Sequence, residues 1–495
     1  MSSVPWSVTS RKVALSAGVA LLRRMKEALC GYFWIDKLYF YYHFYVLHIF
    51  VCKILFMKKI ICSVFSLFVA VILAAQAPVH LELNSEAGVY SKGETVEVYA
   101  SLNEDFDIPL SMRVTCSGKR VTSSNDLQLS VNEKTLIYSG SFDRASAINV
   151  SVGNPEDRNS FKTIGFVVSP EEFRPGFTEP DDLMIFWQSQ IEALRSSEMQ
   201  VKAVEVEHPD NADFVCYDLE ISMPEGNPVR GYLAMPRNAA DASLPIALLP
   251  HAAGVYKPHC QSSIKTAVNW AKKGRGVIAF DVNAHGMLNG QPQEYYDDLD
   301  KTTLKDYSKR PLVSHEEFYF RLMYLRLVRA MDYLTGLKQW DGKRALVYGE
   351  SQGAGQAGAI AALDPRISMT VMNVPAICDL GGVANGLRGG WPSFYSKNIN
   401  NPEAKDLSWS ILPYYDVALL LKYTKSELVI ECGLIDTTCP AECVYAAFNN
   451  ATNSAGKTML TYPRRSHRRV ENPYYKEWEA MVGDVRTRMM DEHLK

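Results

Sequence analysis

The stretch ALVYGESQGA, residues 345–354, decides the fold of this 495-residue chain. It opens with a continuous apolar run, which is typical of a strand that is buried on both faces of a sheet. The small residues that follow, up to position 362, predict a helix. A serine on the sharp turn between such a strand and helix needs small neighbours two positions away on each side, and Gly349 and Gly353 meet that need. Ser351 is therefore our candidate nucleophile.

Further strands and helices alternate along the chain around this stretch. Continuous apolar runs predict buried strands at residues 246–249, 277–280, 369–372 and 428–430, and longer amphipathic segments predict helices at residues 262–273, 316–337 and 442–449. A predicted hairpin, residues 214–223 and 229–235, precedes them. This alternation predicts an α/β fold with an open, doubly wound and mostly parallel sheet.

The chain changes character at about residue 168. Between residues 78 and 168, short runs alternate apolar and polar residues and are separated by turn signals, which predicts a small antiparallel β-sandwich of the immunoglobulin-like type. We expect a packing or spacer role for it, with carbohydrate binding through an exposed face as the alternative. Residues 169–180 are rich in Pro and Gly and are interpreted as a linker. Residues 181–495 form the predicted catalytic domain.

Residues 57–77 have the three parts of a secretory signal peptide: a basic start, an apolar centre and a small-residue cleavage site. Cleavage after Ala77 gives a mature chain that begins at Pro78 and is secreted or periplasmic. We interpret residues 1–56 as upstream sequence read from a wrong start codon. The rival interpretation is a membrane anchor at residues 38–56, which is about long enough to span a bilayer; the protein would then be membrane-anchored.

Composition excludes several classes of function. Residues 1–77 contain 9 Lys and Arg and 2 Asp and Glu, which leaves 43 against 53 and a net charge of −10 for the remainder. An acidic chain without a basic stripe is not expected to bind nucleic acid. The seven cysteines after residue 77 are odd in number and lack the spacing of a disulfide framework. Neither a His-Glu-x-x-His motif nor a phosphate-binding glycine loop occurs in the sequence, so we expect no metal and no cofactor.

The sequence offers two candidates for the acid of a catalytic triad. A serine hydroxyl needs a base, and the base needs an acid that orients it; in this fold the acid follows the serine and precedes the base. Asp436 follows the predicted strand at residues 428–430, which places it at the carboxyl edge of the sheet beside the serine turn. Asp379 follows one strand earlier. We prefer Asp436 and keep Asp379 as the competitor.

The candidate base is His467, which follows another predicted strand at residues 458–462. The sequence has one other histidine after Ser351, which is His493, two residues from the C-terminus in a charged tail. Chain order and strand context therefore favour His467 as the residue that removes the proton from Ser351.

Acyl transfer also needs N–H donors aimed at the oxyanion. One is expected to be the backbone N–H of Gln352, which follows the nucleophile. The second is expected in the loop after the strand at residues 246–249, and we assign it to Ala253 with Ala252 as the alternative. We interpret His251 and His285 as residues that shape loops and not as a second base.

The chain from about residue 171 to residue 469 resembles the acetyl xylan esterase / cephalosporin C deacetylase family of α/β-hydrolases. The stretches that carry the resemblance are FYFRLMYLRLVRAMDYL (318–334), GESQG (349–353), LPYYDVAL (412–419), GLIDTTCP (433–440) and residues 462–467. The resemblance implies an α/β-hydrolase fold and the removal of acetyl groups from xylan oligosaccharides and related small esters without a cofactor. It also implies Ser351, Asp436 and His467 as the triad.

Three positions depart from the family's pattern. Asn283-Ala284-His285 stands where the family usually has Arg-Gly-Gln, and Ser466-His467-Arg468 stands where it has Gly-His-Glu. Ala253 replaces a tyrosine of the oxyanion loop, which keeps the backbone N–H but removes a large side chain from the pocket. The first two departures alter supporting structure, so a homo-oligomer like the family's is left open.

We expect a serine carboxylesterase that removes acetyl groups from acetylated xylan or related oligosaccharides through an acyl-enzyme. Its partner is an acetylated carbohydrate or small ester substrate. One alternative is a serine peptidase of the prolyl oligopeptidase type, although the N-terminal propeller of such enzymes needs far more than about 90 residues. The other is a non-catalytic glycan-binding protein on a hydrolase scaffold, against which an intact triad argues.

Overall fold

The computed structural model describes residues 78–106, 108–394 and 401–495. The predicted signal peptide at residues 57–77 and the extension at residues 1–56 lie outside the described residues. Within the described ranges, no helix combines the length and the apolar character needed to cross a membrane.

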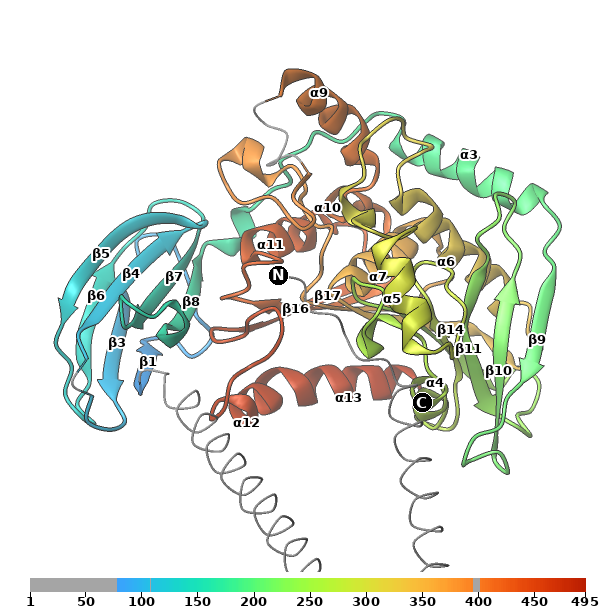
Figure 1. Cartoon of the computed structure of the whole chain (residues 1–495), viewed down its shortest axis with the longest axis horizontal. Coiled ribbons are helices and arrows are strands. Elements are labelled where there is room, and N and C mark those ends of the chain that lie inside the picture. Colours follow the sequence, from blue (N-terminus) through green and yellow to red (C-terminus); the bar gives the residue numbers. More distant parts are fainter. Residues whose placement is uncertain (1–77, 107, 395–400) are drawn as a thin grey trace, which may run out of the picture. The chain divides into compact units, whose positions relative to one another are not determined.

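Two β-sheets pack against each other in the N-terminal part of the described chain (Figure 1). Apolar residues of both sheets, among them Val98 and Val114, form one core. Neighbouring strands are antiparallel except for β2 and β8, which are parallel. The predicted β-sandwich is confirmed, and its immunoglobulin-like type stays a prediction. One sheet has the order β1 (Val79–Leu83), β3 (Val96–Leu102), β6 (Thr135–Gly140), and the other has the order β2 (Val89–Tyr90), β8 (Lys162–Val168), β7 (Ser146–Gly153), β4 (Leu110–Cys116), β5 (Lys119–Leu127).

The remainder of the described chain is built on a nine-stranded sheet. Its six strands from β12 to β17 are parallel, as continuous apolar runs predict, and three antiparallel strands extend one edge. The order across the sheet is β17 (Gly456–Tyr462), β16 (Glu427–Gly433), β15 (Met369–Asn373), β14 (Trp340–Glu350), β12 (Leu244–Pro250), β13 (Ile278–Val282), β11 (Val229–Pro236), β10 (Phe214–Ile221) and β9 (Val201–Glu205).

Helices cover both faces of this sheet (Figure 1). Buried residues of α3, α6, α7 and α11 belong to one apolar core, and those of α4 and α13 belong to a second core on the opposite face. The predicted α/β fold with a doubly wound, mostly parallel sheet is therefore confirmed. The α-helices of the described residues are α3 (Leu183–Ser196), α4 (Ile264–Ala271), α5 (Gln293–Lys301), α6 (Phe320–Leu334), α7 (Gln352–Leu363), α9 (Pro402–Ile411), α10 (Val417–Leu420), α11 (Ala441–Asn450), α12 (Tyr475–Trp478) and α13 (Asp484–His493).

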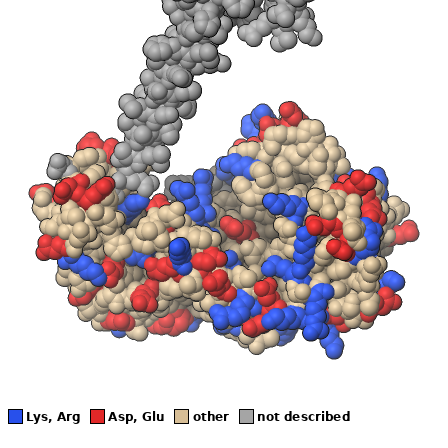
Figure 2. Space-filling view, turned by 90° about the horizontal axis from the view of Figure 1, so that it is seen from below, with Lys and Arg blue, Asp and Glu red and all other residues tan. Residues whose placement is uncertain are grey.

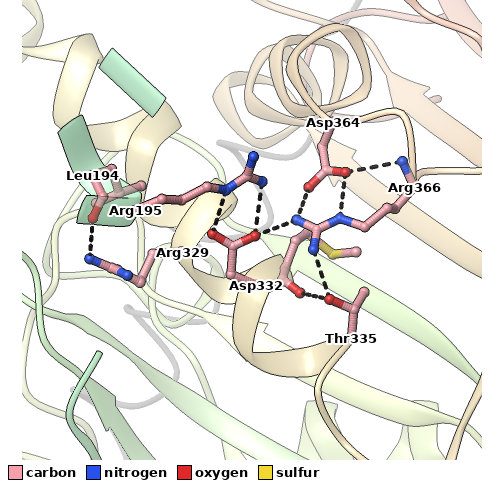
Figure 3. Close-up of polar contacts among 8 residues, drawn as sticks. Leu194, Arg195, Arg329, Asp332, Thr335, Asp364 and Arg366 are labelled. Carbon is pink, nitrogen blue, oxygen red and sulfur yellow. Dashed lines mark hydrogen bonds and ion pairs between the residues drawn. The ribbon is translucent and has the colours of Figure 1, made fainter. Parts of the chain in front are cut away.

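A network of ion pairs joins α3, α6 and the turn after α7 (Figure 3). Asp332 at the end of α6 accepts hydrogen bonds from Arg195 of α3 at 2.9 Å and from Arg366 at 2.6 Å. Arg366 also donates to Asp364 at 2.8 Å and to Thr335 at 2.8 Å. Because α7 begins directly after Ser351, the network fixes the far end of the helix that carries the serine turn.

Two segments have structure that was not predicted from the sequence. Residues 169–180, interpreted as a linker, run across the apolar core and bury Phe173 and Phe177. The C-terminal residues, predicted to be a charged tail, form α13, and His493 there lies 2.9 Å from the Ser368 hydroxyl. The sequence did not predict this helix, because few of its apolar positions are buried, Met490 being one.

Acidic and basic side chains are interspersed on the face of the molecule that Figure 2 shows. Such mixing keeps the local potential small, in contrast to the single-sign surfaces that attract highly charged polymers.

Candidate active site

Ser351 lies on a strained turn between the last residue of β14 and the first residue of α7. Its φ of 57° and ψ of −119° are values that residues with a side chain rarely adopt. A Cβ on Gly349 would lie 2.2 Å from the backbone of Gly353, and one on Gly353 would lie 2.3 Å from Pro250 O. The turn therefore accepts only glycine at both positions, and it holds the Ser351 side chain at the carboxyl edge of the sheet.

The structure brings Ser351, His467 and Asp436 into one hydrogen-bonded chain. Ser351 Oγ lies 2.9 Å from His467 Nε2, and His467 Nδ1 lies 2.8 Å from Asp436 Oδ2. The other carboxylate oxygen of Asp436 accepts the backbone N–H groups of Thr438 and Cys439 at 2.8 Å each. With both oxygens engaged, the carboxylate has one fixed orientation toward the imidazole, which is the arrangement that prepares a serine for attack.

The competing acid, Asp379, lies elsewhere. It is buried, its Oδ1 accepts the N–H of Gly176 at 2.7 Å, and its own N–H donates to Asp416 at 2.8 Å. Burial, together with the Asp416 charge, raises its pKa well above the usual range. A carboxyl group that holds its proton in this way is unsuited to stabilising an imidazolium, and the structure pairs His467 with Asp436.

His251 and His285, which we interpreted from the sequence as residues that shape loops, both contact loop residues. His251 Nε2 lies 2.7 Å from Asp281 Oδ1, and although burial opposes it, that carboxylate raises the pKa of His251. His285 Nδ1 lies 2.8 Å from the Tyr319 hydroxyl and its Nε2 lies 3.2 Å from Gly254 O. Burial, with Arg326 nearby, lowers the pKa of His285 to about 3, so this ring is neutral and acts as a hydrogen-bonding spacer.

The two residues expected to form the oxyanion hole lie in neighbouring segments. Gln352 is the first residue of α7, where backbone N–H groups have no acceptor within the helix. The backbone of the loop that contains Ala253 packs on this turn, since Gln356 Nε2 donates to His251 O at 3.1 Å. The Ala253 carbonyl accepts the Cys260 thiol at 3.1 Å, which orients the peptide that follows it.

Sequence reasoning missed Tyr307, which joins these two segments. Its hydroxyl donates to Gln352 Oε1 at 2.6 Å and accepts the N–H of Gly254 at 3.2 Å. Tyr307 begins a short 3-10 helix, Tyr307–Lys309, and nothing in the sequence distinguishes it from the other 25 of the 26 tyrosines. A buried aromatic side chain with a polar tip is a frequent means of tying two loops together.

Asn283, the first position of the tripeptide that departs from the family's pattern, has its hydrogen-bonding groups satisfied. Its Oδ1 accepts the N–H of Ser262 at 2.8 Å, and its Nδ2 donates to Met287 O at 3.0 Å and to Asn289 Oδ1 at 2.6 Å. Asn283, which stands where the family usually has Arg, is therefore fully hydrogen-bonded to neighbouring residues.

Asp436, Cys439 and His467 are also the one group of described residues whose ligand atoms, all within 4.8 Å, could enclose a metal ion. Two of these side chains are already joined by the hydrogen bond between His467 and Asp436. Burial raises the pKa of Cys439 well above its usual value, and the thiolate, not the thiol, is the metal ligand. The chemistry of the donors therefore fits a hydrogen-bonded acid and base better than a metal centre.

A strained serine turn at the carboxyl edge of a doubly wound sheet, followed in the chain by a buried acid and a histidine that meet at the serine, defines a serine hydrolase of the α/β-hydrolase class. The model of the family described as "Acetyl xylan esterase (AXE1)" matches residues 169–481, more than half of the chain. The chain belongs to this acetyl xylan esterase family and is a carboxylic ester hydrolase, as the resemblance seen in the sequence implied.

Related proteins agree with this assignment. "Acetyl esterase Axe7A" of Xylanibacter ruminicola is 29% identical over 386 residues, which cover 77% of this chain and 81% of that protein. Two solved structures share the fold: the acetyl xylan esterase from Paenibacillus sp. R4, with a TM-score of 0.52 at 21% identity over 64% of this chain and 98% of the other, and acetyl xylan esterase 1 from Thermoanaerobacterium sp. JW/SL YS485, with a TM-score of 0.53 at 21% identity over 66% and 98%.

Proposed function

We propose that the protein removes acetyl groups from acetylated xylan or related oligosaccharides through an acetyl-enzyme on Ser351. The observation that carries the proposal is the chain of hydrogen bonds from Ser351 Oγ through His467 to Asp436, at 2.9 and 2.8 Å. The acetyl esterase of X. ruminicola, which is similar over most of both chains, supports the choice of acyl group.

In the first half of the reaction, Ser351 Oγ attacks the acetyl carbonyl carbon while His467 Nε2 takes the hydroxyl proton. The backbone N–H groups of Gln352 and Ala253 donate to the oxyanion that forms. The tetrahedral intermediate collapses when the bond between the acetyl carbon and the sugar oxygen breaks. His467 returns its proton to that oxygen, and the sugar leaves with a free hydroxyl group.

In the second half, a water molecule attacks the acetyl group on Ser351, with His467 again as the base. The proton passes to Ser351 Oγ as the ester bond breaks, which releases acetate and restores the enzyme. Asp436 keeps the imidazole in the orientation and tautomer that both halves need, because its Oδ2 accepts from Nδ1. No cofactor takes part in this scheme.

Acetate release from a panel of acetylated xylo-oligosaccharides tests the proposal, with p-nitrophenyl acetate as a small ester and peptide amides as the competing substrate class. We expect acetate from the oligosaccharides and loss of turnover in Ser351→Ala. Undiminished turnover in that variant would eliminate the mechanism, and faster cleavage of peptide amides than of esters would favour a peptidase. Binding of polysaccharide without any labelling by a fluorophosphonate would favour a non-catalytic protein.

We also propose that the mature protein is secreted or periplasmic and begins at Pro78. The support is the signal-peptide pattern at residues 57–77. The proposed division into a sandwich at residues 78–168, a connecting segment at 169–180 and a catalytic domain at 181–495 is supported by the end of β8 at Val168 and the start of α3 at Leu183. N-terminal sequencing of the exported protein is expected to read Pro78 first; a longer N-terminus would contradict it.

A further inference from the structure

The β-sandwich touches the two loops that carry the acid and the base of the triad. The N–H of Gly165 in β8 donates to Pro463 O at 2.9 Å, and Asn149 Nδ2 in β7 donates to Leu434 O at 2.8 Å. Pro463 directly follows β17, whose loop leads to His467, and Leu434 directly follows β16, whose loop leads to Asp436. The contacts therefore lie two to four residues from the reacting side chains.

The approach is so close that one sandwich position has no room for a side chain and a second has little room. A Cβ on Gly165 would lie 2.3 Å from Leu434 O, which is well inside van der Waals contact. One on Gly88 would lie 3.0 Å from the ring of Pro463 and 3.1 Å from the Leu434 side chain, and Gly88 also has a φ of +64°. Backbone packs on backbone at this interface, so a shift of β8 is transmitted directly to the acid loop.

The base loop is fastened to the sandwich on its far side as well. Lys162 Nζ lies 2.8 Å from the carboxylate of Glu471, and His80 Nδ1 lies 2.7 Å from the Tyr474 hydroxyl. Arg464 donates to Leu81 O at 2.5 Å and stacks over the Tyr474 ring at 4.4 Å. Contacts before and after His467 thus anchor its loop to the same sandwich.

The two catalytic loops are also bonded to each other. The N–H of Leu434 donates to Tyr462 O at 3.2 Å, and the N–H of Ile435 donates to Arg465 O at 3.3 Å. A displacement at Leu434 therefore moves the segments on both sides of the Asp436–His467 hydrogen bond, which is 2.8 Å long.

From these contacts we infer that the β-sandwich is part of the catalytic apparatus, with Asn149 and Gly165 as positioning residues that set the register of Asp436 against His467. The inference rests on the proposed function, because it assumes that these two residues are the acid and the base. A spacer or a detached glycan-binding module has no need of backbone contact with the two catalytic loops.

Gly165→Ala tests the inference, with Gly153→Ala as its matched control. A Cβ on Gly153 would lie 2.7 Å from the Phe161 backbone, so it meets a comparable obstacle inside the sandwich. With p-nitrophenyl acetate, Gly165→Ala is expected to lower kcat roughly 10- to 100-fold and to leave KM within about threefold, because a misplacement of about 1 Å costs that much in rate. Gly153→Ala is expected to lower Tm but to keep kcat. Equal loss of kcat in the two folded variants would overturn the inference.

A second pair covers the case in which Gly165→Ala does not fold. Asn149→Leu removes the donor to Leu434 O at nearly constant size, and Ser151→Ala, two residues along β7, removes the 2.8 Å hydrogen bond to Thr163 within the sandwich. Asn149→Leu is expected to lower kcat about 3- to 10-fold, and Ser151→Ala to lower Tm alone. Full kcat in Asn149→Leu would count against a positioning role.

A double-mutant cycle separates positioning from general destabilisation. If Gly165→Ala acts through Asp436, it is expected to cost less than about twofold in an Asp436→Ala background, whereas an independent effect multiplies in full. Ser351→Ala is measured alongside. Activity in Ser351→Ala would contradict the proposed function itself. If Ser351→Ala is inactive but the kcat losses of Gly165→Ala and Asp436→Ala multiply in full, the positioning role alone is overturned.

Discussion

The Tyr307 hydroxyl donates a 2.6 Å hydrogen bond to the side chain of Gln352, the residue that follows the candidate nucleophile. The same hydroxyl accepts the N–H of Gly254, which is next to Ala253. Burial raises the pKa of Tyr307 far above its usual value, so the group remains a donor at neutral and alkaline pH. One side chain thus sets the distance between the two segments expected to supply the oxyanion hole.

Tyr307→Phe is expected to lower kcat for p-nitrophenyl acetate about tenfold with little change in KM. Removal of an oxyanion donor lowers kcat about 100-fold or more. The loss in Tyr307→Phe is expected to be smaller, because both N–H donors remain and only the distance between them changes. Steady-state kinetics on the folded variant measure it. The control is Tyr319→Phe, whose hydroxyl contacts His285 and whose ring lies 5.2 Å from that of Tyr307. If both variants lose the same activity, the effect belongs to the aromatic cluster and not to the bridge.

Asp436→Asn and Asp379→Asn are expected to differ widely in activity. Asn at position 436 cannot accept from His467 Nδ1 in the same way and favours the wrong tautomer, which in serine hydrolases costs on the order of 10⁴-fold in kcat. Asp379 hydrogen-bonds backbone groups away from His467, so its variant is expected to stay within about threefold of the wild type. Acetate release measures both. A loss in Asp379→Asn alone would move the acid to the competing position.

The parts of the molecule that the sequence predicts are those set by local patterns. Buried parallel strands are apolar on both faces, so strands such as β14 and β16 stand out in the sequence. The strand β9 does not, because all five of its residues are exposed and no alternation marks it. Chain order and strand context were enough to select Ser351, Asp436 and His467, which the structure joins by two hydrogen bonds.

Contacts between distant segments outside the triad could not be predicted. Tyr307 and Gln352 are 45 positions apart and Asn149 and Leu434 are 285 positions apart, and neither pair shares a repeat or a motif. Their meeting depends on the packing of whole elements, which periodicity does not encode.

Asp332→Asn is expected to reduce stability without reducing activity. The variant leaves Arg195 without its charged partner and leaves Arg366 with Asp364 alone, and the loss of a partly buried pair of this kind costs about 2 kcal/mol. Urea unfolding monitored by fluorescence measures the change, and Asp241→Asn, at an exposed ion pair with Lys338, is the control with little expected effect.

The effect of Asp332→Asn also has a pH dependence of known sign. Burial raises the pKa of Asp332, but the ion pairs with Arg195 and Arg366 outweigh it and hold that pKa below its usual value. The contribution is therefore present above the pKa of the unfolded chain, about 4, and is lost as the pH falls further. The gap in unfolding free energy between wild type and variant is expected to shrink below pH 4; a gap that stays constant to pH 3 would contradict the assignment.

Asp379→Asn is expected to make the protein relatively more stable as the pH rises. Burial raises the pKa of Asp416 to about 7 and that of its neighbour Asp379 well above the usual range, so the folded pair keeps protons that the unfolded chain releases near pH 4. For a carboxyl whose pKa is raised on folding, the stabilising contribution is complete below the unfolded pKa and is lost as the pH climbs through the folded one. Asn at position 379 does not titrate, so the variant does not lose stability at this position as the pH rises. The unfolding free energy of the variant relative to wild type is expected to increase by at least about 1 kcal/mol between pH 5 and pH 7. The control, Asp241→Asn, is expected to show no change in relative unfolding free energy between pH 5 and pH 7. If Asp379→Asn shows no change either, the folded protein does not hold a proton at Asp379.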